Sequence, residues 1–173
     1  MLSAHITGGR SAHALVFSLL MLAGCATEMP APGTPASALS GRFGAPTARY
    51  AMPEGESRLE FATGPYGRET WMVDVNAAGR VLRSVQVLGE GPFAALQQAL
   101  ANHPGMTREQ LLRLIGSPGE RRGGGRQGGE VWSWRYPTND CLWFQVSVAD
   151  DGVVWGASYA IDPRCDAGSD ARE

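Results

Sequence analysis

Two stretches of the sequence repeat one pattern of apolar and polar positions. Each begins as an amphipathic helix and ends at a Gly-x-Pro stop, first at Gly44 and then at Gly116. When the two stops are superimposed, Leu39 falls on Leu111, so the apolar stripes of the two helices coincide. Glycine supplies the positive φ that ends a helix, and a proline two residues later prevents the helix from continuing. The repeat predicts two related units.

After each stop, three segments alternate between apolar and polar residues, as half-buried strands do. They are "SRLEF" (57–61), "TWMVDV" (70–75) and "RVLRSVQVL" (80–88) in the first unit, and "EVWSWRY" (130–136), "LWFQVSV" (142–148) and "VVWGASYAI" (153–161) in the second. A tight turn with a glycine, Gly79 or Gly152, separates the last two segments of each unit and favours a hairpin. We therefore expect each unit to be a helix followed by a three-stranded antiparallel meander.

A further helical pattern, "FAALQQALANH" (93–103), precedes the helix of the second unit. The second unit then has the order ααβββ, whereas the first has little room for an extra helix. One helix and three strands bury too little apolar surface to be stable alone. We expect an α+β fold in which the two units form one body and the helices lie on one face of each sheet.

The opposite faces of the predicted sheets should be polar, because successive side chains of a strand point to opposite faces. The residues at these positions are Arg58, Glu60, Asp74, Ser133, Arg135, Gln145 and Ser147. Trp143 falls among them, and an exposed tryptophan on a sheet face would mark a partner-binding site. The alternative is that the C-terminal tail covers Trp143.

Residues 1–24 have the features of a secretory signal. The apolar run "ALVFSLLMLA" (14–23) follows a start that contains Arg10 and no acidic residue, and it is too short to span a bilayer as a stable helix. The run leads into "LAGC", which resembles the processing site of a bacterial lipoprotein signal. The resemblance implies cleavage before Cys25, acylation of that cysteine and, because Ala26 rather than Asp follows, an outer-membrane destination. An ordinary secretory signal with a coincidental cysteine is the alternative.

If Cys25 carries lipid, two cysteines remain, Cys141 and Cys165. In an oxidising compartment two remaining cysteines are expected to form a disulfide. The alternative, a metal-binding pair, lacks further ligands, because the histidine after the signal, His103, lies in the helix-exit turn "NHPGM". We expect no metal and no cofactor.

The formal net charge of −2 at pH 7 argues against a nucleic-acid partner, which requires a strong basic excess. Enzymatic motifs are also missing from the sequence: there is no Gly-x-Ser-x-Gly and no His-Glu-x-x-His, and no Cys–His pair is left once Cys141 is in a disulfide. Asp150 and Asp151 are adjacent on a turn, so their carboxylates should point apart. We expect a protein without catalytic activity.

The segment "ERRGGGRQGGE" (120–130) combines five glycines with Arg121, Arg122 and Arg126. One interpretation is a mobile surface loop, because glycine-rich segments order poorly. The other is a contact with anionic lipid headgroups through the arginines. The segment is not a phosphate-binding P-loop, because it has no lysine and no strand leads into it.

The second unit resembles the BamE-like (SmpA/OmlA) lipoproteins. The shared features are a Gly-Met-Thr helix start at 105–107, an Ile-Gly-Ser-Pro stop at 115–118, an aromatic strand at 132–136 and a polar-Gly turn at 150–152. The first unit matches more loosely, as a degenerate copy. Proteinaceous β-lactamase inhibitors use the same ααβββ unit in tandem.

The resemblance implies a non-catalytic outer-membrane lipoprotein that faces the periplasm and supports the machinery that inserts β-barrels. Its partners would be membrane lipid, through acylated Cys25, and envelope or barrel-assembly proteins. The alternative function is a periplasmic inhibitor-like or ligand-binding module that uses the free sheet face. The chain divides into a signal peptide (1–24), a Pro-rich tether (25–35), a first unit (36–88), a second unit (89–162) and a C-terminal tail (163–173).

Overall fold

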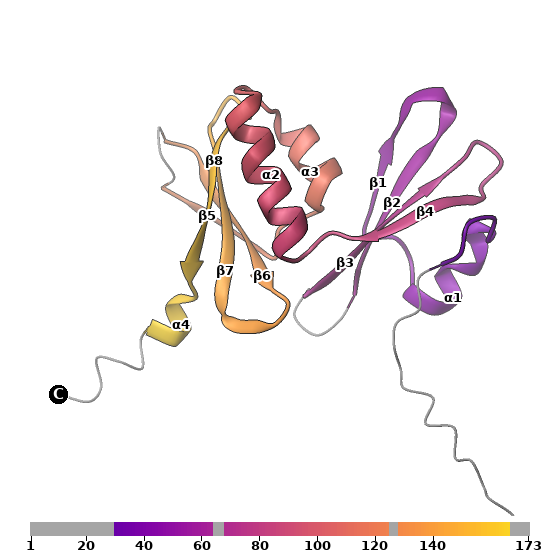
Figure 1. The fold of residues 1–173 in the computed structure, drawn as a ribbon, viewed down its shortest axis with the longest axis horizontal. Coiled ribbons are helices and arrows are strands. Elements are labelled where there is room, and N and C mark those ends of the chain that lie inside the picture. The colour runs from indigo at the N-terminus through magenta and orange to yellow at the C-terminus, as the bar shows by residue number, and fades with distance from the viewer. Residues whose placement is uncertain (1–29, 64–67, 125–127, 167–173) are drawn as a thin grey trace, which may run out of the picture.

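The computed structural model describes residues 30–63, 68–124 and 128–166, which form an α+β fold with two four-stranded antiparallel sheets (Figure 1). The first sheet contains β1 (Ala48–Ala51), β2 (Ser57–Thr63), β3 (Glu69–Val75) and β4 (Val81–Gln86), in that order. The second contains β5 (Glu120–Gly123), β6 (Glu130–Tyr136), β7 (Asn139–Val148) and β8 (Val154–Ile161). The helices are η1 (Ala36–Ala38), α1 (Ser40–Phe43), η2 (Pro53–Gly55), α2 (Glu90–Asn102), α3 (Arg108–Ile115) and α4 (Pro163–Asp166).

Each sheet has one strand more than the three-stranded meander that the sequence predicts. The additional strands, β1 and β5, follow the two Gly-x-Pro stops and pair with β2 and β6, with Arg49 opposite Leu59 and Arg121 opposite Trp132. The sequence pattern predicts no strand in these four-residue segments. They show no apolar alternation because each lies at the edge of its sheet and is largely exposed.

The last hairpin of each sheet has the same irregularity at the same place. The register shifts at the Asp74–Val75 step of β3 and at the Ser147–Val148 step of β7. The turn that follows contains Gly79 with a φ of 71° in the first sheet and Gly152 with a φ of 83° in the second. A β-bulge increases the local twist, so both hairpins bend in the same manner.

The helix starts are attached to these hairpins by matching isolated bridges. Pro35 pairs with Arg80 before η1, and Thr107 pairs with Val153 before α3. The η1–α1 segment thus precedes the first sheet as α3 precedes the second, although it consists of two short helical turns, and α2 has no equivalent before the first sheet. Thr107 caps α3 through a capping box with Gln110, which gives this copy the more regular helix.

Residues 30–35 do not form the free tether that the Pro-rich composition predicts. Pro30 is buried, Gly33 N–H donates to Val81 O at 2.8 Å, and Val81 N–H donates to Thr34 O at 2.9 Å. The backbone of this segment therefore extends the first sheet at the edge of β4. The rest of the expected tether, residues 25–29, lies outside the described residues, as does the signal peptide.

The first core lies between the η1–α1 segment and one face of the first sheet. Its buried members are Leu39, Leu59, Phe61, Trp71, Val73, Val75 and Val81. Phe43 closes it at the helix end, with its ring centre 5.5 Å from that of Phe61. Burial of large apolar side chains at roughly 1.5–3 kcal/mol each makes this cluster the main stabilising contribution within the first unit.

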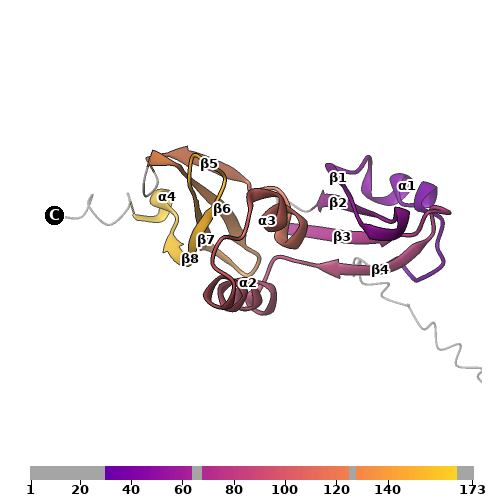
Figure 2. The same cartoon turned by 90° about the horizontal axis from the view of Figure 1, so that it is seen from above.

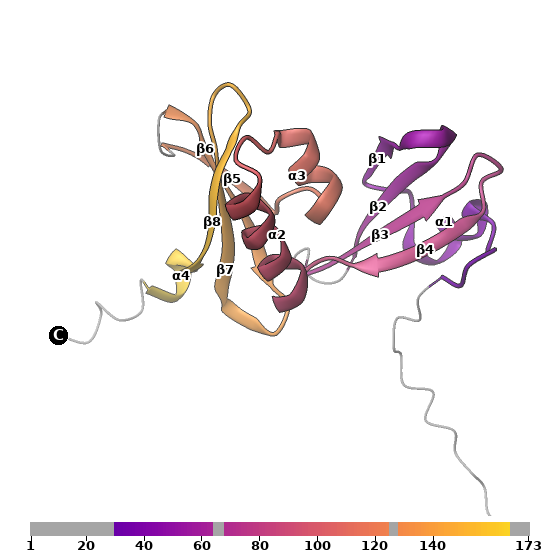
Figure 3. The same ribbon diagram turned by 45° about the horizontal axis from the view of Figure 1, so that its top comes forward.

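The second core lies between α2, α3 and the second sheet. Its main buried members are Phe93, Leu96, Leu111, Ile115, Trp132, Trp134, Phe144, Val146 and Val148. The rings of Phe93 and Phe144 are stacked, 4.1 Å between centres. Met72 of the first sheet also belongs to this core. The helices α2 and α3 lie between the two sheets, so the two units are packed together through them (Figures 1 and 3).

Candidate functional site

A buried carboxylate, that of Glu60 on β2, joins the two units. Glu60 is 0% exposed, and Tyr50 Oη donates to its Oε2 at 2.6 Å. Thr47 Oγ1 donates to Glu60 Oε1 at 3.1 Å. From the second unit, the backbone N–H and the hydroxyl of Ser117 approach Oε2 at 3.1 and 3.3 Å. A buried carboxylate needs such donors, so the helix stop of the second unit is held against the first sheet.

This arrangement changes the pKa of Tyr50. Burial of the ring and the hydrogen bond to Glu60 raise the pKa of Tyr50 above its ordinary value of 10.0. The phenol therefore stays protonated throughout the physiological range and remains a donor to the Glu60 carboxylate. Its hydroxyl is part of the junction between the two units.

A second polar contact between the units is centred on Asp74. Arg58 donates to both carboxylate oxygens of Asp74, at 2.6 and 2.9 Å, and Arg83 Nε donates to Oδ2 at 2.6 Å. Arg58 Nη1 also donates to the backbone oxygen of Arg113, at the end of α3, at 2.7 Å. Burial alone would raise the pKa of Asp74, but the hydrogen bonds from the two arginines lower it below its ordinary value.

These contacts correct the expectation of a free polar face on the first sheet. Arg58, Glu60 and Asp74 alternate with the apolar residues as predicted, but Glu60 and Asp74 are buried and Arg58 is tied to α3. The helix α3 covers the face that the pattern assigned to solvent. The first sheet therefore does not offer the free face on which the inhibitor-like alternative depends.

Two hollows remain between α3 and the first sheet, and both are lined by Arg58 and Leu114. The larger, about 580 Å³, has as its other lining residues Met52, His103, Pro104, Gly105, Met106, Gln110 and Arg113. The smaller, about 280 Å³, opens between β4 and α2 and is mainly apolar, with Met72, Val85, Val87 and Leu96 among its walls. Leu114 is 42% exposed although it faces this junction.

Trp143, the expected partner contact on the second sheet, is buried at 3% exposure. Its Nε1 donates to Asp162 Oδ2 at 2.8 Å, and Arg135 Nη1 donates to the same oxygen at 3.0 Å. The guanidinium groups of Arg122 and Arg135 lie 5.2 and 5.3 Å from the ring centre. The expectation of an exposed tryptophan is wrong. What binds the indole is Asp162, where the chain leaves β8, just before the C-terminal tail of the alternative.

The arginines of the Gly-rich segment are partly engaged with the second sheet. Arg121 stacks on Trp132, with 4.1 Å from the guanidinium carbon to the ring centre, and Arg122 pairs with Glu120 at 2.9 Å. Both belong to β5 rather than to a loop. Arg126 lies outside the described residues. Cation–π contacts with tryptophan orient arginine side chains, so these two are less available for headgroups than the sequence suggests.

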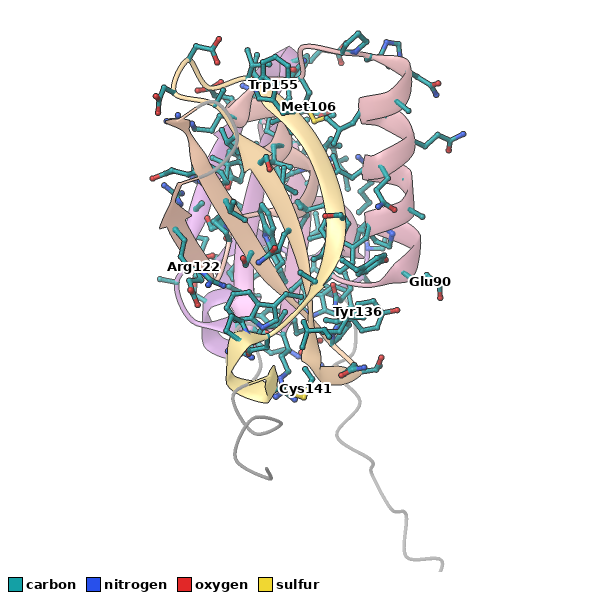
Figure 4. The ribbon with its side chains drawn as sticks, turned by 90° about the vertical axis from the view of Figure 1, so that its left-hand side faces the viewer. Glu90, Met106, Arg122, Tyr136, Cys141 and Trp155 are labelled. Carbon is teal, nitrogen blue, oxygen red and sulfur yellow. A yellow bond between two sulfur atoms is a disulfide. The ribbon has the colours of Figure 1, made fainter. Side chains whose placement is uncertain are left out.

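The expected disulfide between Cys141 and Cys165 is confirmed, with the two Cα atoms 5.6 Å apart. Cys141 lies at the start of β7 and Cys165 in α4, which begins at Pro163 and folds back over the sheet end (Figure 4). Asp162 N–H donates to Cys141 O at 2.9 Å, which fixes the bend. Cys25, the expected lipidation site, lies outside the described residues.

Sequence reasoning missed the junction residues Ser117 and Leu114 and assigned Glu60 to solvent. A local signal existed for Leu114, which follows Leu111 at helical spacing and adds to a stripe wider than one sheet needs. No local signal distinguishes Glu60 from an exposed glutamate, because its partners Thr47, Tyr50 and Ser117 are all distant along the chain.

Neither metal-binding groups nor membrane-spanning helices are found in the part of the chain that the structure describes. There, no three His, Cys, Asp or Glu side chains gather into a potential metal site. No helix within the same residues has the length and apolar character needed to cross a bilayer.

Comparison with solved structures gives a weak likeness at low sequence identity. No family model matches the chain, and no curated protein matches it. The chain is similar to a cysteine-rich secretory protein from Staphylococcus aureus with 10% identity and a TM-score of 0.29. The match covers 77% of this chain and 44% of that protein, so the chain spans less than half of its length.

Proposed function

We propose that this chain is a non-catalytic outer-membrane lipoprotein that faces the periplasm and binds proteins of the envelope or of the β-barrel-assembly machinery. The "LAGC" sequence that ends at Cys25 supports the lipid anchor. The resemblance of residues 93–160 to the BamE-like lipoproteins, with a degenerate first copy, supports the scaffold role. In this proposal the repeated sheets are tandem units of that kind.

The larger hollow beside α3 is the observation that carries the protein-binding part of the proposal. An aliphatic side chain left 42% exposed between two units, Leu114, is a suitable anchor for a partner side chain. Met52 and Met106 add adaptable apolar surface to the same hollow. The hollow is open to solvent, whereas the neighbouring Leu111 and Ile115 are completely buried.

The charge of the hollow indicates the chemistry of the partner. Its charged lining residues are Arg58 and Arg113, and no Asp or Glu lines it among the described residues. Arg58 is already neutralised by Asp74, whereas Arg113 is exposed at the rim. A protein segment that presents an apolar side chain next to a carboxylate would complement this lining.

The hollow also has fixed walls. The Glu60–Ser117 and Arg58–Arg113 contacts both cross from one unit to the other at the C-terminal end of α3. Fixed walls reduce the entropy that a partner must lose on binding. This rigidity suits a scaffold that presents one shape to one partner.

Substitution of Leu114 tests the binding site. Full-length protein is purified from membranes in detergent with Leu114→Gln, and Ile161→Gln serves as the control because Ile161 is 62% exposed on β8, away from the hollow. We expect the wild type and the control to co-purify with barrel-assembly subunits and the Leu114 variant to lose them. Retention of these subunits by the Leu114 variant would contradict the site, and a soluble hydrolase in their place would support the inhibitor-like alternative.

Replacement of the lipidated residue tests the anchor separately. Cys25→Ser should remain unprocessed or become soluble, because acylation is the membrane attachment in this proposal. Sedimentation of the variant with outer membranes after a salt wash would contradict it.

A further inference from the structure

The first residue that the structure describes, Pro30, is already fixed to the edge of the first sheet. Its side chain is buried, and its carbonyl oxygen accepts a hydrogen bond from Ser84 Oγ at 3.2 Å. Gly33 is bound to Val81, and Arg80 Nη1 donates to the carbonyl oxygen of Gly33 at 3.0 Å. Ser84 and Val81 both belong to β4. The chain therefore enters the fold at the middle of the edge strand and not at a loose end.

The short distance along the chain from Pro30 to Cys25 limits how far the fold can lie from a lipid anchor. The two residues are separated by four others, 26–29. An extended chain spans at most about 3.6 Å per residue, so the Cα atom of Cys25 lies within about 18 Å of that of Pro30. An acylated Cys25, which the proposed function includes, sits at the headgroups with its acyl chains in the bilayer. The edge of β4 is then kept close to the lipid surface.

The exposed side chains of this edge suit that position. Leu82 is 40% exposed and Val85 is 41% exposed, and both lie within two residues of Ser84 along the strand. The Arg83 side chain, whose Nε donates to Asp74, is still 63% exposed beside them. Aliphatic side chains can enter the headgroup region, and arginine binds lipid phosphates. Figure 2 shows β4 at the outside of the first sheet, on the same side of the molecule as α2.

We infer that the β4 edge, consisting of Arg80, Leu82, Arg83 and Val85, is the lipid-facing surface of this protein. This inference rests on the proposed acylation of Cys25. It differs from the headgroup contact suggested by the Gly-rich segment, whose described arginines stack on tryptophans of the second sheet. It also places the smaller hollow, which Arg83 and Val85 line, next to the bilayer. A partner in the larger hollow would then be bound at the membrane surface.

A fluorescent label at position 82 tests the orientation. The acylated full-length protein carries Leu82→Cys, or Ile161→Cys as the control on an exposed site of the second sheet. Cys25 is acylated and Cys141 is bonded to Cys165, so the added thiol is the one that reacts with an environment-sensitive fluorophore. Both labelled proteins are reconstituted into vesicles of phosphatidylethanolamine and phosphatidylglycerol that contain a lipid with a nitroxide on its headgroup.

We expect the label at 82 to lose most of its emission to the nitroxide and the label at 161 to keep most of its emission. Equal quenching at the two positions, or quenching at 161 alone, would overturn the orientation. No quenching at 82 in protein that floats with the vesicles would also overturn it, because β4 would then face solvent. Protein that does not float with the vesicles would contradict the acylation itself, so failure of the anchor is distinguished from failure of the orientation.

Discussion

Gly44 and Gly116 end their helices with the same φ of 77°, but only Gly116 is packed against the other unit. A Cβ atom on Gly116 would meet Thr70 at 3.0 Å, Met72 at 3.1 Å and Glu60 at 3.2 Å, whereas one on Gly44 would meet nothing within 4 Å. The two positions therefore share a backbone requirement and differ in their surroundings. This pair of residues can separate the cost of backbone strain from the cost of disturbing the junction.

We expect Gly116→Ala to lower the free energy of unfolding by more than Gly44→Ala does. Each alanine must adopt a positive φ with an extended ψ, a conformation almost restricted to glycine, at a cost of about 1–3 kcal/mol. Only Gly116→Ala also pushes against the Glu60 contacts, and this overpacking adds a cost of roughly 1 kcal/mol. Urea unfolding of both variants measures the difference. Equal losses would mean that the two units are not packed as described.

Removal of the Tyr50 hydroxyl tests the buried carboxylate. Tyr50→Phe leaves Glu60 short of its closest donor and should cost about 1–3 kcal/mol at neutral pH. The pKa of Tyr50 is raised on folding, so its contribution is complete below the unfolded value of 10.0 and is lost as the pH rises above it. The free energy of unfolding, measured as a function of pH, should therefore decline less steeply above pH 10.0 in the variant than in the wild type. An unchanged alkaline profile would show that Tyr50 is not held as described.

The elements that the sequence predicted correctly are those with a strong local signal. Alternating apolar residues identified β2, β3, β4, β6, β7 and β8, and the glycines at 79 and 152 identified their hairpins. The Cys141–Cys165 disulfide could be predicted because two remaining cysteines in an oxidising compartment are expected to pair. The strands β1 and β5 were missed because four exposed residues at a sheet edge have no apolar face to repeat.

The junction could not be predicted, because alternation along a strand shows which residues share a face but not what covers that face. Glu60 and Asp74 lie opposite the first core, as their positions require. Their burial depends on α3, which is distant in the sequence. Ser117, just after α3, donates to Glu60, and the Arg113 carbonyl accepts from Arg58, the partner of Asp74. Trp143 was misjudged for the same reason, since Asp162 closes over it only after the chain has left β8.

Acid should weaken the junction through Asp74. Its pKa is lowered on folding, so its contribution is complete above the unfolded value of 3.8 and is lost as the pH falls through the lower folded value. Asp74→Asn removes this dependence and leaves Arg58 partly buried without its carboxylate, at a cost of about 3 kcal/mol at neutral pH. Unfolding of both proteins as a function of pH measures the effect. Parallel acid profiles would contradict the assignment.

The disulfide should stabilise the protein and also keep Trp143 covered. Cys141 and Cys165 close a loop with a sequence separation of 24, for which the chain-entropy model gives about 3 kcal/mol. The same bend carries Asp162, which binds both the Cys141 carbonyl and the Trp143 indole. The double variant Cys141→Ala/Cys165→Ala should therefore lose stability by that amount and show tryptophan emission shifted toward that of a solvated indole.

Trp143→Phe in the intact and in the disulfide-free protein identifies the source of the emission change. We expect the shift to disappear when Trp143 is absent and the loss of stability to persist, because loop closure does not depend on the indole. A shift that survives Trp143→Phe would come from another tryptophan and would separate the C-terminal bend from the burial of Trp143. Alkylation of the folded wild type without reductant should modify neither Cys141 nor Cys165, and stoichiometric labelling of either one would show that the bond does not form.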